Sequence, residues 1–153
     1  MKAHIFVFAL ILPISYLASP VMGQTPKSSA DLPRMTVYKN PSCGCCHLWI
    51  EHMEQSGFEV KAVDTSNPDG VKDRLGVPGN MRSCHVGVVG DYLIEGHVPA
   101  DLVKRLLKER PKVAGLAVPG MVVGSPGMEG HNPQHYDVVA FTKEGQHTVY
   151  ASR

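Results

Sequence analysis

The chain has 153 residues, with 15 basic and 14 acidic side chains and a formal net charge of +1 at pH 7. This balance gives no basic surface of the kind that attracts nucleic acid or anionic membranes. The length allows one domain with a hydrophobic core but not two substantial ones.

The first residues predict a secretory signal. Lys2 gives a positive start, Ile5 to Leu17 are almost wholly apolar, and Val21-Met22-Gly23 ends the run with small residues at the positions that a signal peptidase reads. The alternative is a retained membrane anchor, but an apolar run broken by Pro13 is shorter than the roughly 20 residues that span a bilayer. We therefore expect residues 1–23 to be cleaved and the protein to be periplasmic.

Removal of the signal leaves equal numbers of basic and acidic side chains, and no later segment reads as a membrane span. We expect no nucleic-acid partner. Residues 24–34, rich in Ser, Thr, Lys and Pro, predict a flexible lead-in. Residues 35–153 then form the single folded domain.

A short β-type run, Met35–Tyr38, opens this domain and stops at the turn signal Asn40-Pro41. A helix is predicted next, capped by Ser42, running to about Gln55 and stopping at Gly57.

Three residues of this helix, Cys46, Ile50 and Met53, fall at i, i+4 and i+7 and should share its inward face. Cys45, next to Cys46, is therefore expected to point elsewhere unless the helix begins late. His52 is interpreted as a surface residue with no metal role.

The remaining elements follow from alternation, helical spacing and turn residues. They are a strand at 58–63, a short helix ending at 75–76, a hairpin of 86–89 with 92–94, a helix at 100–110, a Gly/Pro/Met loop at 118–133, and a hairpin of 136–141 with 146–151. The predicted fold class is α/β, with a strand-helix-strand-helix-hairpin-helix core in the thioredoxin-like order. The Met/Gly/Pro loop and the last hairpin extend that core.

All four cysteines lie after the signal, where export would allow disulfides to persist. Two structural disulfides are one interpretation, with three possible connectivities. However, Cys43, Cys45 and Cys46 are crowded into four residues, and only one of them can pair with Cys84. A second bridge would constrain almost no chain. The spacing favours a reactive or metal-binding centre.

The positive end of a helix dipole should help Cys43 and Cys46 to ionise, and their C-x-x-C spacing brings two sulfurs together. Cys84, with His85 beside it, precedes the third strand, and in thioredoxin-like proteins that segment approaches the cysteine motif. Cys43, Cys46, Cys84 and His85 are therefore the predicted metal ligands. Three sulfurs and an imidazole favour Cu(I) or Zn(II) over a hard ion.

Two methionines of the Gly/Pro loop, Met121 and Met128, favour Cu(I), because thioether affinity is typical of that ion. The alternative is that each packs on the domain surface. His97 is expected to act behind the ligands or as a cap. Possible additional ligands are Cys45, Met121, Met128 and His97.

Four motifs together resemble the small exported bacterial family known as domain of unknown function 411, whose members are described as metal-binding. The motifs are Tyr38-Lys39-Asn40-Pro41-Ser42-Cys43-Gly44-Cys45-Cys46, Ser83-Cys84-His85, Glu95-Gly96-His97-Val98-Pro99 and Gly124-Ser125-Pro126-Gly127-Met128-Glu129. The resemblance covers Met35 to about Ala151. It implies a thioredoxin-like domain associated with copper resistance, with copper binding as its activity.

The leading hypothesis is a non-enzymatic periplasmic metallochaperone or sequestering protein. It would hold Cu(I) and pass it to a copper efflux system or a cuproenzyme. The alternatives are a thiol–disulfide oxidoreductase that uses Cys43 and Cys46, and a structural zinc protein. A redox enzyme needs a proline, often cis, facing its two cysteines. Here Cys84 occupies that region and the nearest preceding proline is Pro78. Without metal, Cys43 could rest bonded to Cys46.

Overall fold

Seven strands form one mixed sheet in the computed structural model, which describes residues 32–153. The predicted signal and residues 24–31 of the lead-in lie outside the described residues. The strands follow the order β2-β1-β3-β4-β5-β6-β7 across the sheet. Their bounds are β1 Met35–Lys39, β2 Val60–Asp64, β3 Val86–Val89, β4 Tyr92–Glu95, β5 Gly115–Ala117, β6 Asp137–Phe141 and β7 His147–Ser152.

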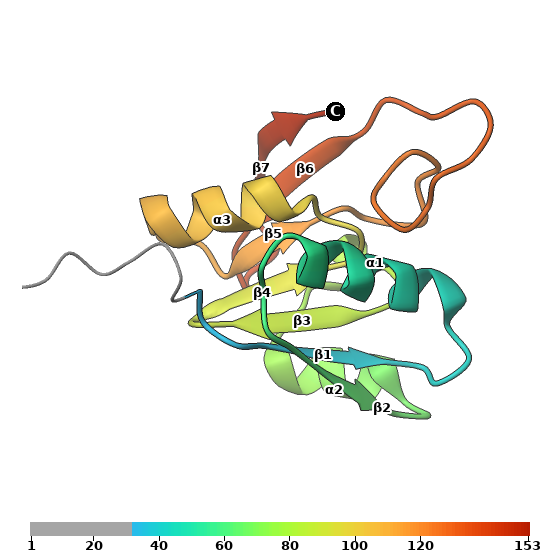
Figure 1. The fold of residues 1–153 in the computed structure, drawn as a ribbon. Helices are drawn as coiled ribbons and strands as arrows, with labels where there is room; N and C mark the ends of the chain where they lie inside the picture. The colour runs from blue at the N-terminus through green and yellow to red at the C-terminus, as the bar shows by residue number, and fades with distance from the viewer. Residues whose placement is uncertain (1–31) are drawn as a thin grey trace, which may run out of the picture.

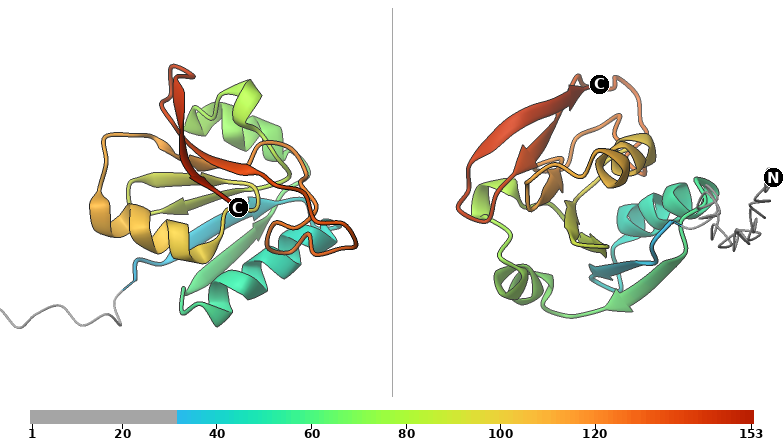
Figure 2. Two further views of the ribbon diagram at one scale, coloured as in Figure 1. Left: turned by 90° about the horizontal axis from the view of Figure 1, so that it is seen from above. Right: turned by 90° about the vertical axis from the view of Figure 1, so that its left-hand side faces the viewer.

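The helices lie on both faces of this sheet. Helices α1 (Gly44–Gln55) and α3 (Ala100–Glu109) cover one face, and α2 (Pro68–Leu75) lies on the other, followed by the short 3-10 helix η1 (Gly79–Met81) (Figures 1 and 2). The main apolar cluster joins α1 and α3 to the sheet through side chains such as Trp49, Ile94 and Leu106. In residues 32–153 no helix is long and apolar enough to cross a bilayer.

Strand β1 sets the position of both cysteine segments. It runs parallel to β2 and antiparallel to β3, and Tyr38 near its end pairs with Val86 at the start of β3. The chain that leaves β1 leads into α1, and the chain that enters β3 carries Cys84. The two segments therefore meet at one edge of the sheet.

Helix α1 begins one residue later than the sequence indicates. Cys43, not Ser42, is the N-cap, and its sulfur accepts a hydrogen bond from the Cys46 amide at 3.3 Å. The Ser42 hydroxyl instead donates to Asn40 Oδ1 at 2.7 Å, within the turn before the helix. The inward face is as predicted, because Cys46, Trp49, Ile50 and Met53 are all buried.

The sequence missed one strand. β5 has only three residues, all buried, so it shows no alternation of apolar and polar side chains. It runs parallel to β4 and antiparallel to β6, and so joins the predicted terminal hairpin to the rest of the sheet. The strand at 58–63 also begins later than predicted, at Val60.

Gly115 lets β4 and β5 pair, because a Cβ at this position would overlap the Leu93 carbonyl oxygen. Gly115→Ala should therefore reduce the free energy of unfolding by about 2 to 3 kcal/mol, as overpacking against rigid backbone does. Gly79→Ala is the matched control, since a Cβ there meets nothing within 4 Å. It should change stability by no more than about 0.5 kcal/mol. Urea unfolding of both variants measures this, and equal stabilities would contradict the close approach.

Candidate metal centre

Four sulfur atoms gather where α1 begins and β3 is entered. The Sγ atoms of Cys43, Cys45, Cys46 and Cys84 all lie within 4.8 Å of one another. This includes Cys45, which was expected to point elsewhere unless the helix began late. Because the helix starts only at Gly44, Cys45 sits in the first turn, where its side chain can still reach the other sulfurs.

Two of these sulfurs are bonded to each other. Cys43 and Cys46 form a disulfide, and Cys45 and Cys84 are free thiols. Cys45 Sγ lies 3.6 Å from Cys43 Sγ. Reduction of the disulfide, which takes up two electrons and two protons, would give four thiols at one place. Cys46 is fully buried, whereas the other three are partly exposed, so the cluster is open on one side.

Cys84 also belongs to a second group of donors. Its Sγ lies 3.1 Å from His85 Nδ1 and 3.1 Å from His97 Nε2. Both rings are fully buried, with their centroids 5.1 Å apart. His97, expected to lie behind the ligands, thus reaches Cys84 directly, as His85 does.

The protonation of His97 follows from its second contact. Its Nδ1 lies 2.7 Å from the Pro126 carbonyl oxygen, which can only accept, so Nδ1 carries a proton and donates. Burial lowers the pKa of His97, which favours the neutral ring. A neutral ring with its proton on Nδ1 has a lone pair on Nε2, facing Cys84. The Pro126 carbonyl therefore orients His97 as a metal ligand requires.

Burial also sets the protonation of the neighbouring groups. It raises the pKa of the Cys84 thiol to about 12, with a further contribution from Cys45. It lowers the pKa of His85 well below the usual value, and the neighbouring His97 and Lys72 lower it further. Burial raises the pKa of Glu95 to about 7, although Lys72 acts in the opposite direction. Near pH 7 the metal-free site therefore holds a Cys84 thiol between two neutral imidazoles.

The donor set of Cys84, His85 and His97 can hold either a proton or a soft cation. In the metal-free site the Cys84 S–H can donate to His97 Nε2 while its sulfur accepts from His85 Nδ1, which leaves His85 Nε2 buried without a hydrogen-bond partner among residues 32–153. A metal ion in place of that proton can take the thiolate and imidazole nitrogens together. Such binding would release a proton from Cys84.

Trp49 packs against the buried side of the site. The centroid of its ring lies 4.4 Å from that of the His85 ring, and its Nε1 donates to the Val98 carbonyl oxygen at 2.9 Å. One buried side chain of α1 thus holds both the His85 ring and the segment that follows His97.

His52, predicted to be a surface residue, is partly buried, and its Nε2 accepts a hydrogen bond from the Ala100 amide at 3.1 Å, which caps α3. Its sequence neighbours give no signal of this contact.

The Gly/Pro/Met loop at 118–133 lies beside the first turns of α1 (Figures 1 and 2). Met121 is 48% exposed, and its Sδ lies 3.7 Å from the Ser83 hydroxyl, next to Cys84. Met128 is partly buried, and its amide donates to the Ser125 carbonyl oxygen within the loop. The loop therefore brings one exposed thioether beside the residue that precedes Cys84, while Met128 takes part in the loop's own turn.

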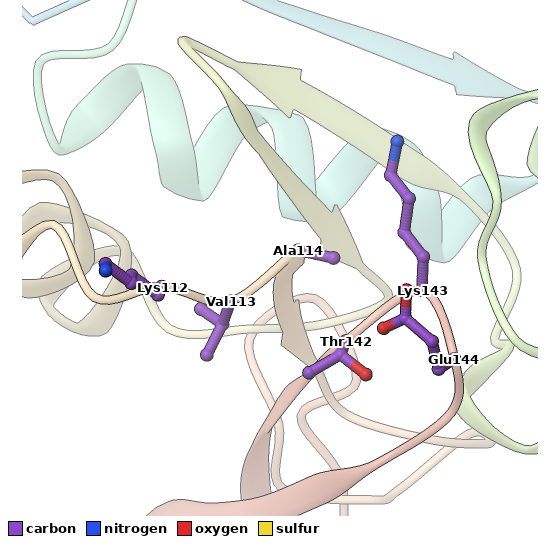
Figure 3. Close-up of a pocket in the computed structure, with 6 residues that line it drawn as sticks. All are labelled: Lys112, Val113, Ala114, Thr142, Lys143 and Glu144. Atoms are coloured by element: carbon purple, nitrogen blue, oxygen red, sulfur yellow. The ribbon is translucent and has the colours of Figure 1, made fainter.

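A surface pocket of about 330 Å³ lies away from these residues (Figure 3). It is formed by the segment before β5 and the turn between β6 and β7. The side chains of Lys112 and Lys143 point away from each other in it, so they do not converge on a ligand. We assign the pocket no role in the site.

Gly127 allows the loop to pack closely on α1. Its φ is +78°, and a Cβ there would lie 2.7 Å from the backbone nitrogen of Trp49. Gly127→Ala should therefore destabilise the protein and speed hydrogen exchange of the loop amides. Gly120→Ala is the control, since it shares a positive φ of +77° but has nothing within 4 Å. We expect Gly127→Ala to cost about 1 to 3 kcal/mol more than the control in urea unfolding. Equal costs would mean that the loop does not rest tightly on α1.

Comparison with known proteins agrees with the geometry. The model of the family "Protein of unknown function, DUF411" matches residues 81–128, which include Cys84, His85, His97 and both loop methionines. No curated protein matches the chain. Two solved structures, Form 1 and Form 2 of copper resistance protein CopG, are 44% identical to it with TM-scores of 0.75. The alignments cover 80% of this chain and 99% of Form 2 or 98% of Form 1. The chain therefore belongs to the DUF411 family of copper-resistance proteins.

Proposed function

We propose that this protein is a periplasmic copper-binding protein that holds Cu(I) through cysteine thiolates, for copper resistance by sequestration or transfer. The observation that carries the proposal is the meeting of four cysteine sulfurs within 4.8 Å of one another at the start of α1. The likeness to structures named copper resistance protein supports copper as the metal. The proposed ligands are Cys43, Cys46, Cys84 and His85, with Cys45 and His97 available beside them.

The donor chemistry favours Cu(I) over Zn(II). Thiolate and thioether sulfur are soft ligands that suit Cu(I), and the exposed Met121 offers a thioether at the edge of the cluster. A structural zinc site would be closed by four ligands and would need no exposed sulfur. An open edge with a thioether suits an ion that is received and passed on, to an efflux system or to a cuproenzyme.

The thioredoxin-like assignment and the export route belong to the same proposal. From β1 to α3 the chain follows the predicted order of strands and helices, with a C-x-x-C pair at the start of α1 and a hairpin before α3. The apolar segment at 5–17 supports export to the periplasm. There, an external thiol or dithiol would have to reduce the Cys43–Cys46 disulfide before all four sulfurs could bind metal.

Anaerobic titration of the reduced protein with Cu(I), against a competing chelator and with Zn(II) in parallel, tests the proposal. Cys84→Ser should lower the Cu(I) affinity by at least about tenfold, or about 1.4 kcal/mol, because a hydroxyl replaces the sulfur shared by both donor groups. Cys45→Ser should cost less, because no imidazole nitrogen is within hydrogen-bonding distance of Cys45 in the described residues.

Circular dichroism would confirm that both variants fold. The proposal fails if the parent protein binds Cu(I) no more tightly than the chelator does. Parent-like affinity in folded Cys84→Ser would confine the metal to the cysteines of α1.

A thiol–disulfide oxidoreductase is the second candidate, favoured by the Cys43–Cys46 disulfide at the start of a helix. The nearness of Cys84 weakens it, since a third thiol could trap the mixed disulfide that such an enzyme forms. Deletion of the gene separates the two functions. We expect greater copper sensitivity with normal disulfides in exported proteins, and the reverse phenotype would support the oxidoreductase.

A further inference from the structure

Two oppositely charged side chains are buried next to the segment that carries Cys84. Glu95, at the end of β4, is 0% exposed, and Lys72, on α2, is 1% exposed. Lys72 Nζ lies 3.0 Å from Glu95 Oε1. Neither residue is among the proposed ligands, so the copper chemistry alone does not account for them.

Both charged groups also bind the backbone of Ser83, the residue before Cys84. Lys72 Nζ donates to the Ser83 carbonyl oxygen at 2.5 Å, and the Ser83 amide donates to Glu95 Oε1 at 2.6 Å. The three residues thus form a closed ring of contacts. It fixes both polar groups of the Ser83 main chain.

His85, the residue after Cys84, is also hydrogen-bonded through its main chain to the residue that follows β4. The Gly96 amide donates to the His85 carbonyl oxygen at 3.0 Å. A Cβ at Gly96 would lie 2.6 Å from Ser83 Cβ, so the two segments touch. Cys84 therefore lies between two residues whose backbones are anchored to the end of β4, which fixes the main-chain position from which its sulfur projects.

Stability alone is a weak reason for a buried ion pair. Desolvation of two charges can exceed their attraction, and apolar side chains of similar volume often serve equally well. Loss of one partner, by contrast, leaves a buried lone charge and is strongly destabilising. A test of function must therefore replace both residues together.

We propose that Lys72 and Glu95 are positioning residues, which hold Cys84 where its sulfur meets both the α1 cysteines and His97. This inference rests on the proposed copper function and names residues outside the ligand set. It gives the buried pair the role that outer hydrogen-bond partners have at other metal sites, where their loss costs about 10- to 100-fold in affinity.

The double variant Lys72→Met/Glu95→Leu removes both charges and keeps apolar bulk. We expect it to fold, as judged by circular dichroism and thermal unfolding, and to bind Cu(I) at least about tenfold more weakly than the parent. If it does not fold, Lys72→Met/Glu95→Gln replaces it, because the side-chain oxygen of the introduced glutamine can still accept from the Ser83 amide. Parent-like Cu(I) affinity in a folded double variant would overturn the inference.

The same double change in the Cys84→Ser background distinguishes positioning from general loosening. If the pair acts through Cys84, it should cause little further loss of affinity there. An equal loss in both backgrounds would overturn the inference. Asp73→Asn is the matched control, because Asp73 on α2 pairs with Arg82, the residue before Ser83, at 2.5 Å. It should leave Cu(I) affinity unchanged, and a tenfold loss would point to loosening of α2 instead.

A metal-free readout separates this inference from the copper proposal. In a Cys43→Ser/Cys46→Ser background, diamide can oxidise the neighbouring Cys45 and Cys84 thiols to a disulfide, taking up their two electrons and two protons. The double change at Lys72 and Glu95 should slow this cross-link by about threefold or more, because Cys84 is less well placed. If the parent binds no Cu(I), the copper proposal fails. Slower cross-linking would still support the positioning role, and an unchanged rate would overturn it.

Discussion

The antiparallel pairing of β1 with β3 decides where the chemistry of this protein takes place. Tyr38 and Val86 are neighbours across these strands, so the chain leaving β1 and the chain entering β3 share one sheet edge. The first supplies three cysteines at the start of α1, and the second supplies Cys84. The hydrophobic core holds this register, because Met35 and Val37 of β1 are fully buried against it. A one-residue slip would turn these side chains out of the core.

The site then adds buried polar groups to an otherwise apolar interior. His85, His97, Glu95 and Lys72 are almost fully buried, and such groups are costly unless they are paired. Most of their contacts lead to Cys84 or to its neighbours: two ring nitrogens reach its sulfur, and the ion pair holds Ser83. The fold thus concentrates polar burial at one place, which is the pattern expected of a functional site and not of a structural core.

Local sequence patterns predicted most of the elements but not all the contacts of the site. Helical spacing identified the inward face of α1, and turn residues identified the β3–β4 hairpin. The three buried residues of β5 carried no periodicity, and its pairing depends on strands distant in the chain. The sequence gives no signal that Lys72 is buried, because its partner Glu95 is far away in sequence and only the fold brings the two together. His97 was predicted only as a possible additional ligand, since its contact with Cys84 also depends on the fold, and the cap that His52 gives to α3 was missed for the same reason.

The Cys43–Cys46 disulfide links the redox state of the cysteine cluster to the number of sulfurs that could bind a metal. With the Cys43–Cys46 disulfide closed, two of the four sulfurs are unavailable, and the remaining thiols are Cys45 and Cys84. Burial raises the pKa of Cys84 to about 12, so Cys84 is a thiol near pH 7 and metal binding there would release its proton. Reduction of the disulfide supplies the additional thiols of the cluster. Reduction should therefore precede metal binding by Cys43 and Cys46, whereas Cys84, His85 and His97 can receive a metal in either redox state, with release of the Cys84 proton.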